Sequence, residues 1–128
     1  MNKLIFSLIL LFVCACGGFL CNIKVHVTTR SDEPVEVVAM FSNKTKHRFV
    51  LIEKDDMENF TINHDNCAKK PTLLRVFDMD SQKMGETQAF IDGFGQLVYT
   101  IQEQQSIPRM VSRIGVSCAF GDCGMRGK

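Results

Sequence analysis

The sequence predicts a small all-β domain, an antiparallel β-sandwich of about seven or eight strands, stapled by disulfides and preceded by a signal peptide. Three observations carry this prediction. Beyond Cys21, apolar residues alternate with polar ones, as in strands that bury one face. Turn-forming residues interrupt this pattern at the spacing of ~8 to 12 residues that sandwiches and barrels show. Four cysteines lie along the same stretch.

Residues 1–17 have the order of a cleavable export leader, and residues 18–128 then form a single domain. Lys3 gives the start a positive charge, Leu4–Val13 is an apolar run interrupted only by a serine, and small residues follow. The run is shorter than the ~20 residues that comfortably span a bilayer, and no later window is comparably apolar. The stretch Val13–Gly17 also resembles the lipobox of bacterial lipoproteins, which would imply lipidation of its last cysteine.

The first predicted strands are marked by alternation and by the turn formers between them. Ile23–Thr28 alternates strictly, so one face should be buried. Val35–Phe41 follows the turn cluster Ser31–Pro34 and is apolar enough to be buried more fully. Arg48–Ile52 is rich in β-formers and follows the polar turn Asn43–Lys46.

The later strands follow in the same way. The acidic stretch Asp55–Asn59 breaks the pattern and is interpreted as a loop or a single helical turn. A second turn is expected at Asp92–Gly95, because glycine alternates with other residues there. The remaining strands are expected at Phe60–Ile62, Thr72–Phe77, Thr87–Ile91, Gln96–Ile101 and Met110–Val116.

Two of the six cysteines lie in the leader, and the domain keeps Cys21, Cys67, Cys118 and Cys123. An even set of four in an oxidising compartment argues for two disulfides. Longer closed loops restrict the unfolded chain more, so we expect bridges that tie the tail back to Cys21 and Cys67. The alternative is a short local ring between Cys118 and Cys123.

Two sequons of the Asn-x-Thr type make Asn43 and Asn59 candidate acceptors of N-glycans, in turns or at strand edges. They fit a eukaryotic secretory route better than a bacterial lipoprotein. Together with the leader, the four cysteines and the lack of a second apolar span, they predict a secreted, extracellular protein. We expect no membrane span once the leader is removed.

Charge and motifs argue against two classes of function. The formal net charge is +1 with the leader, and no basic patch or acidic tail is visible, so we expect no nucleic-acid partner. The sequence has no nucleophile elbow and no phosphate-binding glycine loop. Disulfide formation would also remove the thiols that a cysteine nucleophile needs. We therefore expect a protein that is not an enzyme and has no cofactor, calcium excepted.

Calcium is suggested by Asp78 and Asp80, which directly follow a predicted strand. Carboxylate oxygens on loops suit this ion, which takes six to eight oxygen ligands. The stretch Leu73–Gly85 resembles the loop of C2 domains, where a strand ends in Asp-x-Asp, and this resemblance implies a calcium site. The alternative is an ordinary turn in which Asp78, Asp80 and Ser81 bond their own backbone.

Four apolar residues are expected to be exposed because they fall in predicted turns, and they could form a contact surface: Met57, Met79, Met84 and Phe94. The opening Gly18–Asn22 resembles the first strand of the transthyretin-like secreted proteins of nematodes, which implies a small disulfide-bonded β-sandwich. We expect a non-enzymatic extracellular module that binds a protein partner through loops at one end. The alternatives are a carrier of a small hydrophobic ligand in the interior, and calcium-dependent binding.

Overall fold

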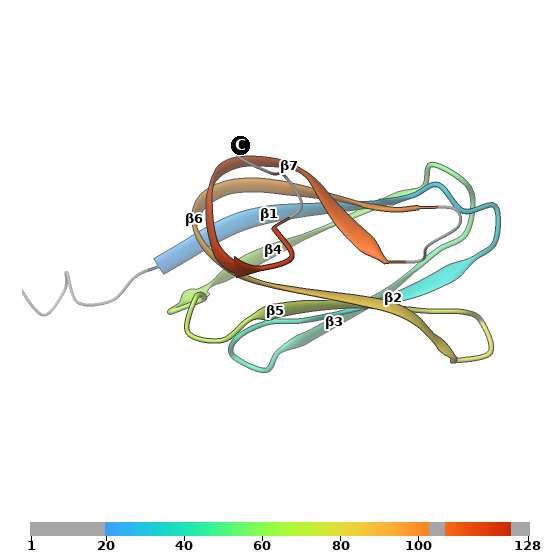
Figure 1. Cartoon of the computed structure of the whole chain (residues 1–128), viewed down its shortest axis with the longest axis horizontal. Helices are drawn as coiled ribbons and strands as arrows, with labels where there is room; N and C mark the ends of the chain where they lie inside the picture. The colour runs from blue at the N-terminus through green and yellow to red at the C-terminus, as the bar shows by residue number, and fades with distance from the viewer. Residues whose placement is uncertain (1–19, 103–106, 124–128) are drawn as a thin grey trace, which may run out of the picture.

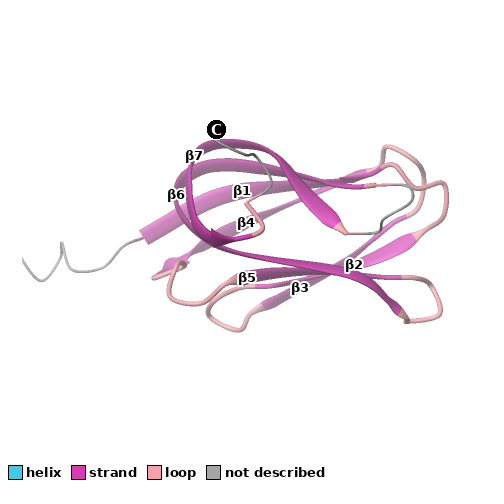
Figure 2. Ribbon diagram, viewed as in Figure 1, coloured by secondary structure: helices cyan, strands magenta, loops and turns pink. Residues whose placement is uncertain are grey.

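The computed structural model describes residues 20–102 and 107–123, so the predicted leader lies outside the described residues. The described chain is all-β, as predicted, and Figure 2 shows strands joined by short loops. Its seven strands are β1 (Leu20–Thr29), β2 (Val35–Met40), β3 (Lys46–Leu51), β4 (Met57–Asp65), β5 (Thr72–Phe77), β6 (Lys83–Ile101) and β7 (Pro108–Gly121).

The seven strands form one sheet in the order β3-β2-β5-β6-β1-β4, with β7 paired to β6. The first part of β6 pairs with β5, whereas its last part pairs with β1 and β7. The sheet curls at β6, so that β2, β3 and β5 face β1, β4 and β7 across the interior (Figure 1). The fold is therefore barrel-like, with two facing layers that belong to a single sheet.

The sheet is mixed, which corrects the prediction of a purely antiparallel one. The pair β1–β6 runs parallel, from Asn22 opposite Phe94 to Thr29 opposite Ile101, and every other pair is antiparallel. A parallel pair needs a long connection between its strands. Here β2 to β5 supply that connection, and the reversal of β6 brings its last part back along β1.

The reversal depends on glycines in the segment that was predicted to be a turn between two strands. In the structure this segment is a bend inside the continuous strand β6, where the β6–β7 register shifts between Gly93 and Gln96. Gly93 has φ 118°, which side-chain-bearing residues rarely adopt. A Cβ at Gly95 would lie 1.8 Å from the carbonyl oxygen of Ile114, so only glycine lets β7 approach β6 this closely.

The interior is filled by the apolar residues that alternate along the strands. On β1, Ile23, Val25 and Val27 are almost completely buried, as the strict alternation predicts. Between β3 and β4, which do not pair through hydrogen bonds, aromatic rings close the seam. The ring of Phe60 lies 5.3 Å from His47 and 6.0 Å from Phe49, measured between centroids. The described core thus packs across both layers.

Candidate functional site

Two disulfides are present, Cys21–Cys67 and Cys118–Cys123, here called the core disulfide and the tail disulfide. The expected bridges between the tail and the core are wrong, and the local ring is the one that forms. The reason is the register, because Cys21 lies opposite His64 on β4, only three residues before Cys67. The two disulfides are compatible with an extracellular or otherwise oxidising compartment.

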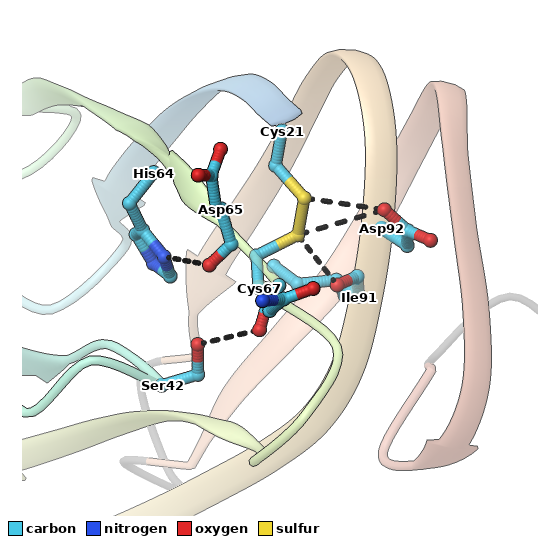
Figure 3. The surroundings of a disulfide bond; sticks show 8 residues. Cys21, Ser42, His64, Asp65, Cys67, Ile91 and Asp92 are labelled. Atoms are coloured by element: carbon cyan, nitrogen blue, oxygen red, sulfur yellow. Dashed lines mark hydrogen bonds between the residues drawn. A yellow bond between two sulfur atoms is a disulfide. The ribbon is translucent and has the colours of Figure 1, made fainter. Parts of the chain in front are cut away.

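The core disulfide is fully buried and has the carboxylate of Asp92 beside it (Figure 3). Asp92 Oδ1 lies 3.1 Å from Cys21 Sγ and 3.7 Å from Cys67 Sγ. Bonded sulfurs carry no proton, so these are close sulfur–oxygen contacts rather than hydrogen bonds. The two sulfurs and the carboxylate are close enough to share a metal ion, but a metal needs thiolates, which a disulfide does not offer.

The core disulfide fixes the β4–β5 loop (residues 66–71) to β1, and a hydrogen bond joins the same loop to the β2–β3 turn (residues 41–45). Ser42 Oγ donates a hydrogen bond of 3.3 Å to the carbonyl oxygen of Asn66, which Figure 3 shows. The same carbonyl oxygen accepts a hydrogen bond of 3.1 Å from the backbone N–H of Lys69, and this bond closes a tight turn. Asn66 and Lys44 both have positive φ, 55° and 71°. These bonds place two loops, distant in sequence, side by side.

A surface pocket of about 310 Å³ opens between these two loops, and its lining consists of Ser42, Asn43, Lys44, Asp65, Asn66, Lys69 and Lys70. The lining carries three lysines and one carboxylate. All four charged side chains are exposed. A smaller pocket of about 160 Å³ shares Asn66 and Lys69 with the first and is also lined by Ala68 and Asp92. The site is therefore polar, predominantly basic and open to solvent.

We call this part of the molecule the disulfide end, comprising residues 41–45, residues 66–71 and the bend of β6 at residues 91–95. Sequence reasoning did not single out its lysines. The adjacent pair Lys69-Lys70 beside Cys67 was the available signal, together with the polar turn that contains Lys44. These lysines converge because β2 pairs with β5, which brings the β2–β3 turn next to the β4–β5 loop.

A third pocket, of about 390 Å³, is lined by Glu86, Thr87, Ile107, Pro108, Arg109, Met110 and Asp122. Its acidic groups already have partners. Asp122 Oδ2 accepts a hydrogen bond of 2.9 Å from Thr87 Oγ1. Hydrogen bonds from Arg75 and then Lys83 lower the pKa of Glu86. Elsewhere, burial raises the pKa of Tyr99 well above its ordinary range, so this phenol stays neutral in the core.

The structure places Asp78 and Asp80 in the β5–β6 hairpin, where Asp78 shapes the turn. Asp78 Oδ1 accepts hydrogen bonds of 2.9 Å from the backbone N–H groups of Asp80 and Gln82. Ser81 takes φ 64° at the tip. Within residues 20–102 and 107–123, the only group of three metal-ligand side chains in mutual reach is the one at the core disulfide. The hairpin thus has the geometry of the ordinary turn, and calcium binding there stays a prediction.

The four apolar residues expected at turns are all exposed, with exposed fractions of 60% for Met57, 58% for Met79, 42% for Met84 and 63% for Phe94. They do not form one surface. Phe94 pairs with Asn22 at the start of β1, whereas Met57 pairs with Thr28 near its end. Phe94 therefore belongs to the disulfide end, and Met57 lies at the opposite end.

Both sequon asparagines are exposed on the surface. Asn43 lies in the β2–β3 turn, where its Oδ1 accepts a hydrogen bond of 3.0 Å from the backbone N–H of Thr45. Asn59 lies within β4, opposite His26 of β1, and its Oδ1 contacts the imidazole of that residue. A glycan at Asn43 would stand on the wall of the basic pocket.

No family model, no curated protein and no solved structure matches the chain. The part of the chain that the structure describes contains no helix that is long and apolar enough to cross a membrane.

Proposed function

We propose that the chain is a secreted, non-enzymatic binding module that acts through the loops of the disulfide end. One observation carries the proposal, namely the polar pocket of about 310 Å³ that two loops form together. The core disulfide and the Ser42–Asn66 hydrogen bond hold these loops in place. A binding site whose loops are fixed in advance loses less conformational entropy when its ligand arrives.

The secreted location is part of this proposal. Its support is the export-leader pattern of residues 1–17 together with the two disulfides. N-glycosylation at Asn43 or Asn59 would follow from the same route.

A binding role is favoured over catalysis by the state of the reactive groups. All four cysteines among the described residues are joined in disulfides. Tyr99 is buried and neutral, and Glu86 is held by Arg75 and Lys83. The alternative of a carrier for a hydrophobic ligand is disfavoured, because the described core side chains occupy the space between the two layers.

The test uses glycans as steric blocks at the two ends of the barrel. Ala68→Asn combined with Lys70→Thr creates a sequon in the β4–β5 loop, and Lys70→Thr alone is the matched control for the lost lysine. Met79→Asn creates one at the opposite end, because Ser81 already stands two residues later. All proteins carry Thr45→Ala, which removes the sequon of Asn43 on the pocket wall. They are secreted from eukaryotic cells, and glycan attachment is verified by mass. Saturable binding to cell surfaces and extracellular matrix is then measured.

We expect the glycan at position 68 to abolish binding and the glycan at position 79 to leave it intact. Enzymatic trimming of the glycan at position 68 should restore binding to the level of the Lys70→Thr control. Loss of binding with the glycan at position 79 alone, or no effect of either glycan, would show that the disulfide end is not the binding surface.

A further inference from the structure

We propose that the pocket at the disulfide end binds the sulfate groups of a sulfated sugar chain, an inference that rests on the proposed function. The juxtaposition that carries it is Lys44 from one loop and Lys69 and Lys70 from the other, around a single pocket. The sequence separates the first lysine from the other two by a strand, a loop and a further strand.

The charges of the pocket favour an anion. Its lining has three ammonium groups against the one carboxylate of Asp65. A lysine ammonium is a compact point charge with freely rotating donors, which suits the oxygens of a tetrahedral oxyanion. The hydroxyl of Ser42 and the amides of Asn43 and Asn66 add neutral polar groups to the same wall. Together these groups can contact a sulfate and the sugar hydroxyls beside it.

The backbone that carries the lysines is fixed before any ligand arrives. Lys69 donates its backbone N–H to Asn66, and Lys44 donates its own to Phe41 at 2.9 Å. The core disulfide anchors the β4–β5 loop two residues before Lys69. Only the lysine side chains must lose freedom on binding, which lowers the entropic cost of the complex.

The size and surroundings of the pocket favour a sugar chain over a membrane. A volume of about 310 Å³ lies at the lower limit of ligand pockets, so it would admit one unit of a chain. Basic surfaces that dock on bilayers also insert apolar side chains. Among the described residues, none of the exposed large apolar side chains lines this pocket, and Phe94, the exposed aromatic residue of the disulfide end, lies on the bend of β6 outside its lining. A secreted protein also meets sulfated sugars directly.

The experiment measures binding of the full secreted chain to a heparin tetrasaccharide by calorimetry over a series of NaCl concentrations. All proteins carry Thr45→Ala, which removes the sequon of Asn43 but keeps Asn43 itself. The test variant combines Lys44→Gln, Lys69→Gln and Lys70→Gln. The control variant removes the same charge elsewhere through Lys24→Gln, Arg30→Gln and Lys54→Gln, all at exposed positions.

We expect the test variant to lose about tenfold or more in affinity at physiological salt, the effect of three weak ion pairs. The slope of the logarithm of the binding constant against the logarithm of the salt concentration should also become shallower by roughly two to three, because fewer counterions are released on binding. The control variant should lose less than about threefold. Asp65→Asn should tighten binding, since it removes the one opposing charge of the lining.

Three results would overturn the proposal. The first is absence of heparin binding by the parent protein. The second is an equal loss in the test and control variants, which would reflect net charge alone. The third is lysine-dependent binding to phosphatidylserine vesicles that exceeds heparin binding, which would make the anion a lipid phosphate. If the glycan at position 68 still blocks binding to cells and matrix in these cases, the proposed function stands and only the sulfated ligand fails.

Discussion

Removal of the two disulfides, one at a time, should destabilise the protein to different extents. The core disulfide closes a loop with a sequence separation of 46, and the tail disulfide one of 5. In the chain-entropy treatment these loops contribute about 4 kcal/mol and about 2 kcal/mol of stability at 25 °C. Burial adds to the difference, because Cys21 and Cys67 are fully buried, whereas Cys118 and Cys123 are partly exposed.

One variant replaces both cysteines of the core disulfide by alanine, and a second replaces both cysteines of the tail disulfide. Neither leaves a free thiol among the cysteines that the structure describes. Urea unfolding followed by circular dichroism gives the free energies, and calorimetry should show melting temperatures lowered by roughly 20 °C and roughly 10 °C. Equal losses, or a larger loss for the tail pair, would refute the reasoning. Either result would mean that the core disulfide does not anchor the fold.

Three further predictions concern single side chains. Gly95→Ala should lower the free energy of unfolding in urea by about 3 kcal/mol or more, because its Cβ would lie 1.8 Å from a carbonyl oxygen of β7. The control Gln96→Ala, at the next and exposed position, should change it by no more than about 0.5 kcal/mol. Similar losses in the two variants would contradict this explanation. The hydrogen bond from Arg75 lowers the pKa of Glu86 below its ordinary value of 4.5, so that pair stabilises at neutral pH and loses its effect as pH falls through the lowered pKa. The stability difference between wild type and Glu86→Gln should be under about 1 kcal/mol for an exposed pair. It should shrink as the pH falls below 4.5 and through the lowered pKa of Glu86; a difference that does not change with pH would exclude the pair as its source. Asp92→Asn should speed reduction of the core disulfide by dithiothreitol about tenfold, since a carboxylate 3.1 Å from the sulfur repels the attacking thiolate. The reduction rate is measured by alkylation of the thiols that are released. An unchanged rate would show that the carboxylate has no such role.

The strands were predictable because their signal is local. Alternation alone identified the buried face of β1, and Asp78 with its neighbours carried the residues of a turn. The segment Asp92–Gly95 shows where this reasoning fails. Its glycines were interpreted as a break between strands, but they serve a sharp bend and the close passage of β7. A glycine pattern does not tell these two uses apart.

The pairings between distant segments could not be predicted in the same way. The parallel pair β1–β6 and the partner of Cys21 both depend on register between strands far apart in sequence. The basic pocket has the same origin, since Lys44 meets Lys69 and Lys70 where β2 pairs with β5, with Met40 opposite Leu73, and Ser42 bonds to Asn66. Exposure of Met57 and Phe94 was predicted correctly, but their separation to opposite ends follows from the topology.

The central claim, that the disulfide end binds a sulfated sugar chain, is tested most directly by mapping the ligand on the protein. Backbone amide resonances of the ¹⁵N-labelled Thr45→Ala protein are followed by NMR while a heparin tetrasaccharide is added. We predict saturable shifts at residues 42–44 and 65–70, and none at residues 53–55 and 79–81 at the opposite end. Shifts confined to the opposite end, or no saturable shifts at all, would contradict the claim.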